Sequence, residues 1–364
     1  MSEAVCSDSD AELDSRIARY IDLGYSRERA LGQLLLAGFS AEALKRRFPD
    51  LPQGAFLLGL PPAVTPPGWR SPTLSREIGP PAGLAATKAA AAAVDDTSGI
   101  AFHYVPLIQC SFPHADPGDA VSFSRRNGWL ELTVGTTRPA TGLPYGVPAR
   151  LLTIYCTSEA IRTRAPEIYL GRSLHDFLRR LDVPITRGDR GSLRVYANQL
   201  LRLIHATLTI DEHLRDDSGR TGIHIRQALF AEEARLWWDE DRAAGEGSSL
   251  LISQVLFQSI LERSAPLSAS AIKALRKSPM DLDVYAWLVH RLYQLGKPST
   301  VTWEQLSQQF GHSYRALRAF RRFFGDSLAR VRVVYPDANV KVSDQGLLLL
   351  PSRPHVAPRA RPIR

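Results

Sequence analysis

Cysteine is scarce in this sequence of 364 residues, and long apolar runs are missing from it. The three cysteines, Cys6, Cys110 and Cys156, lie far apart and are odd in number, which argues against a disulfide framework and against a spaced metal cluster. We therefore expect a reducing, cytoplasmic environment. No run approaches the roughly 18 apolar residues of a membrane span. The N-terminal MSEAVCSDSDAELDS is acidic where a secretory signal would be basic and then apolar, so we expect neither secretion by that route nor a membrane span.

Enzyme signatures are missing as well. The chain has no GxxxxGK[ST] phosphate loop, so ATP-driven melting of DNA is unsupported. It has no HxH or HExxH pair that would hold a catalytic metal. We expect no catalytic activity, no cofactor and no metal ion, and we interpret the nine histidines as surface or core residues.

The sequence does contain a basic excess, and that excess is unevenly distributed. The overall composition, with 44% hydrophobic and 23% charged residues, is typical of a globular protein with two or three domains. The formal charge of +8 is concentrated in residues 271–364, with 16 basic and 6 acidic residues, and in residues 150–210, with 10 and 5. Residues 211–246 carry 10 acidic and 5 basic residues. Two basic modules thus flank an acidic stretch, which indicates an anionic partner.

The C-terminal module has the order of elements found in a winged helix-turn-helix domain. Apolar spacing predicts a helix over 282–292 and a second helix opened by a capping box at Thr302 and Gln305. The turn 311–313 leads to a third helix that starts at Tyr314. Strands are predicted over 331–335 and 340–342, followed by the apolar run 347–350. Helix, helix, tight turn, helix and hairpin is the winged-helix order.

The middle of the chain repeats this order approximately. Helices are predicted over 144–162, after a cap at Ser173, and from the cap Ser192 to about His205. Strands over 206–210 and 223–227 follow, and the region before these helices has strand character over 102–112 and 129–133, with a turn at Gly128. The predicted fold class is therefore α+β, with tandem winged-helix domains, an N-terminal helical segment and a disordered linker.

Composition shifts divide the chain into five predicted segments. These are an N-terminal helical segment over 1–50, a Pro- and Ala-rich linker over 51–98, a first winged-helix domain over 99–265, a second over 266–352, and a basic, disordered tail over 353–364. The tail either adds nonspecific affinity for DNA or serves as a solubilising extension.

The third helix of the C-terminal module carries the main candidate residues for DNA recognition. On a helical wheel Arg315, Arg318 and Arg322 form a stripe opposite Leu317, Phe320 and Phe324. Arg321 lies at the margin of the stripe, where it would meet backbone phosphate. A charged stripe is usually a solvated face, but no acidic residue accompanies these four arginines, which favours DNA contact. Arginine suits the role because its planar fork binds guanine or phosphate bidentately.

The corresponding helix of the first module is a weaker candidate. Arg194, Asn198 and Arg202 gather opposite Leu193, Ala197, Leu200 and Ile204. DNA contact, dimer contact and plain solvation remain open for this face. Arg190, in the loop before the helix, could approach phosphate, with a flexible connecting loop as the alternative.

Two long blocks resemble a known family. The stretch 142–184 (GLPYGVPARLLTIYCTSEAIRTRAPEIYLGRSLHDFLRRLDVP) followed by 190–210 (RGSLRVYANQLLRLIHATLTI) resembles the core of plasmid-encoded RepA-type replication initiators. The stretches 271–311 and 330–352 resemble that family's C-terminal region. The resemblance extends from about Phe102 to Ser352.

The resemblance implies a bacterial plasmid initiator that binds repeated origin sites, called iterons, on double-stranded DNA and recruits host helicase-loading or initiator proteins. In related initiators the N-terminal winged helix also mediates dimerisation, so a homodimer is expected. The arginines of the last long helix match the recognition-helix position. We thus predict a non-enzymatic plasmid replication initiator that promotes origin opening.

Two alternatives remain from the sequence. A winged-helix transcriptional regulator would use the same fold for DNA binding alone. A nicking rolling-circle initiator would need a metal-binding histidine pair, and the sequence has none.

Overall fold

The computed structural model describes most of the chain after residue 82. The described residues are 14, 17, 18, 83–92, 99–188, 191–216, 219–237, 247–311, 314 and 316–356. The predictions for 1–50, for most of the 51–98 linker and for 357–364 therefore lie outside the described residues.

The C-terminal unit, which we define as residues 279–349, is built from three helices and a three-stranded antiparallel sheet. Its elements are α11 (Pro279–Tyr293), β10 (Ser299–Thr302), α12 (Trp303–Phe310), α13 (Leu317–Val334), β11 (Val340–Val342) and β12 (Gly346–Leu349). The strand order is β10-β12-β11. The predicted capping box is present, with the Thr302 hydroxyl accepting from the Gln305 amide and the Gln305 side chain accepting from the Thr302 amide.

One predicted strand of this unit is wrong. Residues 331–335 continue α13 to Val334, because Val331 is completely buried on the same face as Phe324 and Leu328. Tertiary burial outweighs the modest helix propensity of valine, and the helix ends just before Pro336. The hairpin is instead formed by β11 and β12.

The central unit, residues 146–252, has the same order of elements. Its members are α6 (Gly146–Thr163), β4 (Glu167–Gly171), α7 (Leu174–Arg180), α8 (Ser192–Ile204), β7 (Ala231–Arg235) and β8 (Ser248–Ile252). Its sheet order, β4-β8-β7, matches β10-β12-β11 position by position. As predicted, the Ser173 hydroxyl caps α7, whereas Gly191 takes the cap position of α8 in place of Ser192.

A long hairpin interrupts the central unit between α8 and β7. The strands predicted over 206–210 and 223–227 are the start of β5 (Ala206–Arg215) and part of β6 (Thr221–Leu229). They join β2 (Ser122–Asn127) and β3 (Leu130–Thr136) in an antiparallel sheet of order β2-β3-β5-β6. This hairpin is therefore an insertion, and the counterpart of the C-terminal hairpin is β7 with β8.

In the described chain, six short elements lie outside the two units, three before the central unit and three between the units. They are β1 (Ile100–Tyr104), α5 (Val105–Gln109), the 3-10 turn η1 (Pro139–Thr141), α9 (Gln254–Glu262), β9 (Ser264–Ser268) and α10 (Ala269–Leu275). Only the beginning of the predicted 102–112 strand is extended, since Pro106 in the first turn favours the short helix α5. The predicted turn at Gly128 joins β2 to β3 with a positive φ of 60°.

The predicted linker contains a helix. The sequence LAATKAAAA forms α4 (Leu84–Ala92), in agreement with the high helix propensity of alanine. Thr87 is buried, and α4 packs against α10 and α13. This part of the 51–98 segment is thus attached to the C-terminal unit.

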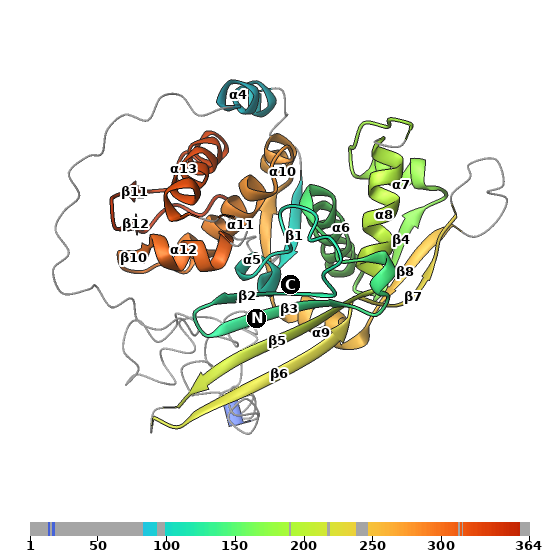
Figure 1. Cartoon of the computed structure of the whole chain (residues 1–364), viewed down its shortest axis with the longest axis horizontal. Helices are drawn as coiled ribbons and strands as arrows, with labels where there is room; N and C mark the ends of the chain where they lie inside the picture. Colours follow the sequence, from blue (N-terminus) through green and yellow to red (C-terminus); the bar gives the residue numbers. More distant parts are fainter. Residues whose placement is uncertain are drawn as a thin grey trace, which may run out of the picture.

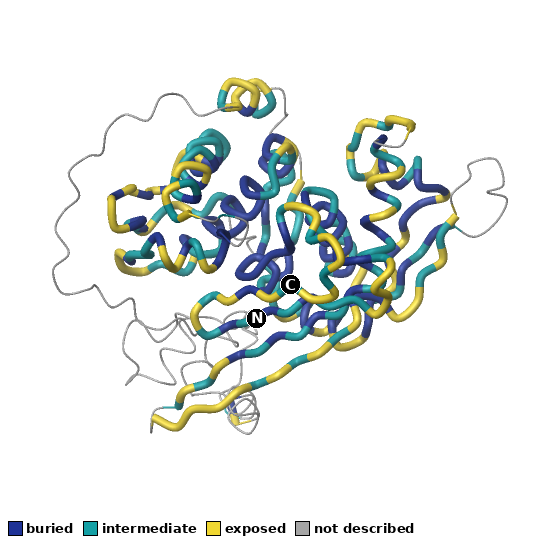
Figure 2. The backbone as a smooth tube through the Cα atoms, viewed as in Figure 1, coloured by how far each residue is buried: buried dark blue, intermediate teal, exposed yellow. Residues whose placement is uncertain are grey.

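The core lies where the two units meet. Figure 1 shows the C-terminal unit on the left, α7 and α8 on the right, and α6, β1 and α11 between them, with the long sheet running beneath. Buried residues are concentrated in that middle region (Figure 2), where α11 is buried along most of its length. A single cluster of buried apolar side chains includes residues of both units. The two units are therefore packed as one body.

Candidate nucleic-acid interface

Helix α13 separates a buried aromatic face from an exposed basic one. Phe320 and Phe324 are completely buried, and the Phe324 ring packs 6.0 Å from Trp303 and 5.7 Å from Phe310, both on α12. Arg318 and Arg322 are exposed on the other side of the helix. Aromatic packing against α12 thus fixes the direction in which the two arginines point.

The exposed arginines have no acidic partner among the residues that the structure describes. No described carboxylate lies within ion-pair distance of Arg318 or Arg322, although Asp326 is on the same helix. Arg315, the third member of the predicted stripe, lies outside the described residues. The part of the stripe that is described therefore presents uncompensated positive charge to solvent.

Arg321 lies beside this stripe and has internal contacts. Its guanidinium lies over the Trp303 ring, 5.2 Å from the centroid, and its Nη2 is 3.6 Å from the Asp344 carboxylate. Asp344 belongs to the turn between β11 and β12. Arg321 thus connects α13 to α12 and to the hairpin, which sets the position of the hairpin beside the helix.

An exposed aromatic residue in this region was missed by the sequence reasoning. Phe323 has half of its surface exposed and stacks at a tilt on Tyr314, with ring centroids 5.3 Å apart. A phenylalanine between an arginine stripe and a core face is the local signal that could have indicated it. It places an apolar ring at the edge of the basic face.

Helix α8 of the central unit differs from α13. Its fully buried residues are Tyr196, Gln199, Leu200 and Leu203, so the buried face is rotated from the predicted one, of which only Leu200 is fully buried. Arg194 and Asn198 are exposed, as a surface role requires. Arg190 lies outside the described residues.

Arg202, at the end of α8, contacts the segment that precedes α6. Its Nη1 donates to the Leu143 carbonyl at 3.0 Å and lies 3.3 Å from an Asp116 carboxylate oxygen. The guanidinium also lies 5.0 Å from the centroid of the Tyr145 ring. These contacts give Arg202 a role in positioning the chain at the start of α6, and DNA contact by this residue stays a prediction.

The hairpins of the two units differ in their exposed charges. On β7 of the central unit Glu232 and Glu233 are exposed, and Trp237 just after it is half exposed. In the C-terminal hairpin the exposed charged residues are Lys341 on β11 and Asp344 in the turn. The two glutamates and the exposed Arg235 give β7 a net negative charge, which repels a polyanion, whereas the charges of Lys341 and Asp344 cancel.

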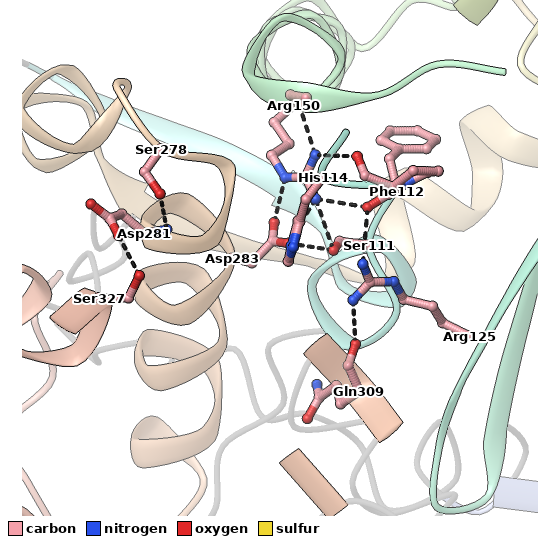
Figure 3. Close-up of polar contacts among 12 residues, drawn as sticks. Ser111, Phe112, His114, Arg125, Arg150, Ser278, Asp281, Asp283, Gln309 and Ser327 are labelled. Carbon is pink, nitrogen blue, oxygen red and sulfur yellow. Dashed lines mark hydrogen bonds and ion pairs between the residues drawn. The ribbon is translucent and has the colours of Figure 1, made fainter. Parts of the chain in front are cut away.

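A buried polar network fixes the two units against each other (Figure 3). Arg150 of α6 is almost completely buried, and its Nε and Nη2 bond the Asp283 carboxylate of α11 at 2.6 and 2.7 Å. The same carboxylate accepts from Ser111 at 2.5 Å and contacts His114 Nε2 at 2.8 Å. Arg150 also donates to the carbonyls of Phe112 and Gly146. The network therefore connects α6 and α11, the first helix of each unit, through direct hydrogen bonds between Arg150 and Asp283.

Burial controls the protonation of this network. Desolvation lowers the pKa of His114 to about 4, against the opposing effect of Asp283. It lowers the pKa of the neighbouring His103 to about 4 as well. Burial alone would raise the pKa of Asp283, but Arg150 and His114 hold it well below its usual range. At neutral pH the network thus contains a charged Arg–Asp pair and a neutral histidine.

Sequence reasoning missed this network, although a signal for it was present. Asp281 and Asp283 stand in an otherwise apolar helix, α11, which indicates buried charges with partners. Asp281 is the second case, since its carboxylate bonds Ser327 at 2.5 Å and Arg330 at 2.6 and 2.8 Å on α13. Arg330 is thereby an anchor of α13.

The described part of the chain contains neither a metal-binding cluster nor a membrane-spanning helix. There, no group of three His, Cys, Asp or Glu side chains is arranged to hold a metal ion. No described helix is long and apolar enough to cross a membrane.

One comparison with known proteins, the match to a family model, agrees with the resemblance seen in the sequence. Residues 143–305 match the model of a family described as plasmid-encoded RepA protein, which confirms the family resemblance predicted from the sequence. The match includes the whole central unit and the start of the C-terminal unit. Among solved structures, a crystal structure of domains 2 and 3 of RctB aligns with a TM-score of 0.40 and 11% identity, over 67% of this chain and 95% of that one. No curated protein matches the chain.

Proposed function

We propose that this chain, whose residues 143–305 match the model of the plasmid-encoded RepA family, is a plasmid replication initiator that binds repeated origin DNA without catalysing a reaction. Both units have the order of a winged helix-turn-helix, with a helix, a strand, two helices and a hairpin. The third helix of each unit, α8 or α13, occupies the recognition position. We therefore assign both units to the winged-helix type and the C-terminal one to DNA recognition.

The observation that carries this proposal is the exposed arginine pair of α13. Arg318 and Arg322 lie on one face of a helix that follows α12 after a short turn, and the opposite face is fixed by buried aromatic rings. In a helix-turn-helix the second helix enters the major groove, where arginine binds guanine O6 and N7 or a phosphate. Rigid placement reduces the entropy lost when these side chains bind DNA.

The central unit would occupy a neighbouring face of the repeat. Arg194 and Asn198 are its exposed candidates on α8, and in Figure 1 this helix lies on the opposite side of the shared core from α13. Two reading helices held in one rigid body would contact successive major-groove segments. Binding would then favour bending and opening of an adjacent AT-rich segment, with host helicase-loading proteins recruited to it in the bacterial cytoplasm.

A salt titration of binding to the DNA upstream of the gene tests this proposal. Replacing Arg318 and Arg322 together with Ala should weaken binding by about 30-fold or more, since each bidentate base contact is worth about 1–3 kcal/mol. It should also lower the slope of log affinity against log salt if phosphate contacts are lost. The control is Arg162→Ala on α6, which removes an exposed arginine paired with Glu159. Equal affinity and slope for the double variant and the wild type would contradict the assignment.

The alternative function is a transcriptional regulator that binds the same DNA. A plasmid that carries only this gene and its upstream repeats separates the two. Maintenance of that plasmid in a host supports the initiator. Specific binding without maintenance supports the regulator.

We also propose that a homodimer forms through strand β6. It is an edge strand of the long sheet, and its outward residues Ile223, Ile225 and Leu229 are about half exposed. An exposed apolar edge strand is a template for antiparallel pairing with a second copy. Sedimentation of the wild type and of Ile225→Lys tests this, with a monomeric variant expected and an unchanged mass contradicting it.

A further inference from the structure

A cleft lies between the free edge of β2 and helix α12, outside the recognition helix. Strand β2 is an edge strand of the long sheet, and its open side faces α12 of the C-terminal unit (Figure 1). The cleft has a volume of about 550 Å³ and is lined by Ser124, Arg125, Arg126, Gly128 and Gln308. No acidic side chain is among these lining residues.

Arg125 is buried at this cleft without a carboxylate partner among the described residues. It is only 3% exposed, and its guanidinium donates to the backbone carbonyls of Gln309 at 2.5 Å and Phe112 at 3.4 Å (Figure 3). Its Nε is buried and has no acceptor. Desolvation lowers its pKa to about 10, so it remains charged at neutral pH. The Asp283 carboxylate favours this charge from a distance but forms no ion pair with it among the described residues. Burial of the cation is therefore costly, and an anion in the cleft would offset part of that cost.

The neighbouring side chains add donors on the exposed side of the cleft. Arg126 is exposed, and its Nε donates to the Gly128 carbonyl at 3.1 Å, which fixes the side chain over the turn. Its terminal amino groups have no acceptor in the described part of the chain. Gln308 is exposed on α12 and Ser124 on β2. Glu131 lies opposite Arg126 in the strand register but makes no ion pair with it among the described residues.

This set of donors suits one ligand chemistry. Arginine, glutamine and serine side chains are typical contacts of backbone phosphate in protein–DNA complexes. In a helix-turn-helix the first of the two helices crosses the DNA backbone while the second enters the groove. The cleft is beside α12, which is that first helix, so it lies where a phosphate passes when α13 is in the groove.

We propose that the cleft between β2 and α12 binds a backbone phosphate of duplex DNA through Arg125 and Arg126. The β2–β3 hairpin, which comes before both units in the chain, would thereby extend the interface of the C-terminal unit. This inference rests on the proposed DNA-binding function. It adds a contact that positions the duplex without reading its sequence.

The full-length chain with Arg126→Ala tests the cleft, since this exposed residue can be replaced without disturbing the core. Loss of one phosphate contact should lower the magnitude of the slope of log affinity against log salt by about 0.9. It should weaken binding to origin and to non-origin duplexes by the same factor. Gln308→Glu, which places a carboxylate in the cleft, should also weaken binding to both duplexes. Arg162→Ala is again the matched control. Loss of affinity for the origin duplex alone, or an unchanged slope, would overturn the proposal.

Ethylation interference gives an independent readout for the same site. One phosphate whose ethylation impairs wild-type binding should cease to matter in Arg126→Ala. If the wild type binds DNA through α13 but Arg126→Ala retains the full interference pattern, the cleft does not bind a DNA phosphate. The inference about the cleft then fails, while the proposed DNA-binding function stands. If the wild type binds no DNA, the proposed function fails. If saturating inorganic phosphate abolishes DNA binding equally in the wild type and Arg126→Ala, the phosphate contact lies elsewhere.

Discussion

The central and C-terminal units share one order of elements but differ in what their third helices present. In the C-terminal unit, α13 exposes Arg318 and Arg322 with no acidic partner in the described structure, and the following hairpin exposes Lys341. In the central unit, Arg202 of α8 contacts Leu143 and Asp116, and the hairpin strand β7 exposes two glutamates. The same order of elements thus presents exposed arginines on α13 in one unit and an arginine held by internal contacts on α8 in the other.

The units also differ in their insertions. The central unit carries the β5–β6 hairpin between its third helix and its own hairpin, while the C-terminal unit has none at that position. The insertion completes a separate sheet and creates the exposed edge of β6. This difference is consistent with the proposal that the C-terminal unit is the main DNA-recognition unit and that the central unit serves mainly in assembly.

The largest predicted effect comes from breaking the network that connects the units. Asp283→Ala leaves Arg150 buried without its counter-charge, which typically costs about 3–5 kcal/mol. The free energy of unfolding, measured in urea, should decrease by that amount. Asp344→Ala is the control, because it removes an exposed carboxylate from the same unit and should cost less than about 1 kcal/mol. Equal, small losses for both variants would show that the units do not depend on Asp283.

Acid should weaken the same contact between the units. The pKa values of His103 and His114 are both lowered to about 4 in the folded chain, against 6.5 when unfolded. Between these values the unfolded state binds more protons, so stability is complete above about pH 6.5 and is lost as pH falls toward 4. Each histidine contributes on the order of 2–3 kcal/mol to this loss. A urea midpoint that does not change from pH 7 to pH 4.5 would refute this. In His103→Gln the midpoint should depend less steeply on pH than in the wild type.

Matched substitutions on the two recognition helices sharpen the comparison. We expect Arg194→Ala with Asn198→Ala to weaken origin binding by less than about 10-fold, well below the effect of the Arg318 and Arg322 pair. Fluorescence anisotropy with labelled duplex measures both in one experiment. Equal losses for the two pairs would mean that both units read the DNA equally.

The smallest predicted effect concerns the helix caps. Thr302→Ala removes a complete capping box from α12 and should cost about 1 kcal/mol of stability. Ser173→Ala removes a single cap bond from the corresponding helix α7 and should cost less. Thermal unfolding of the two variants compares them, and a larger loss for Ser173→Ala would contradict the ranking.

Local chemistry made much of this fold predictable. Caps at Ser173 and Thr302, and the separation of Phe320 and Phe324 from the arginines of α13, follow from residues within one or two helical turns. The repeat of element order could be read from the same signals. The wrong strand over 331–335 shows the limit, since valine favours strands until tertiary burial decides otherwise.

The parts that were not predictable depend on contacts between distant residues. Strands β5 and β6 have a clear pattern, but their pairing with β2 and β3 is a property of the sheet. Arg150 and Asp283 are 133 residues apart, and Arg125 meets Gln309 across 184. The network between the units and the cleft beside α12 therefore emerge only when the chain is folded.

A footprint of the full-length chain on the DNA upstream of its gene tests the central claim most directly. The account predicts protection of repeated sites, with contacts on successive major-groove segments, and loss of that protection when Arg318 and Arg322 are replaced by Ala. Absence of any protected repeat, or protection that persists unchanged in the double variant, would contradict it.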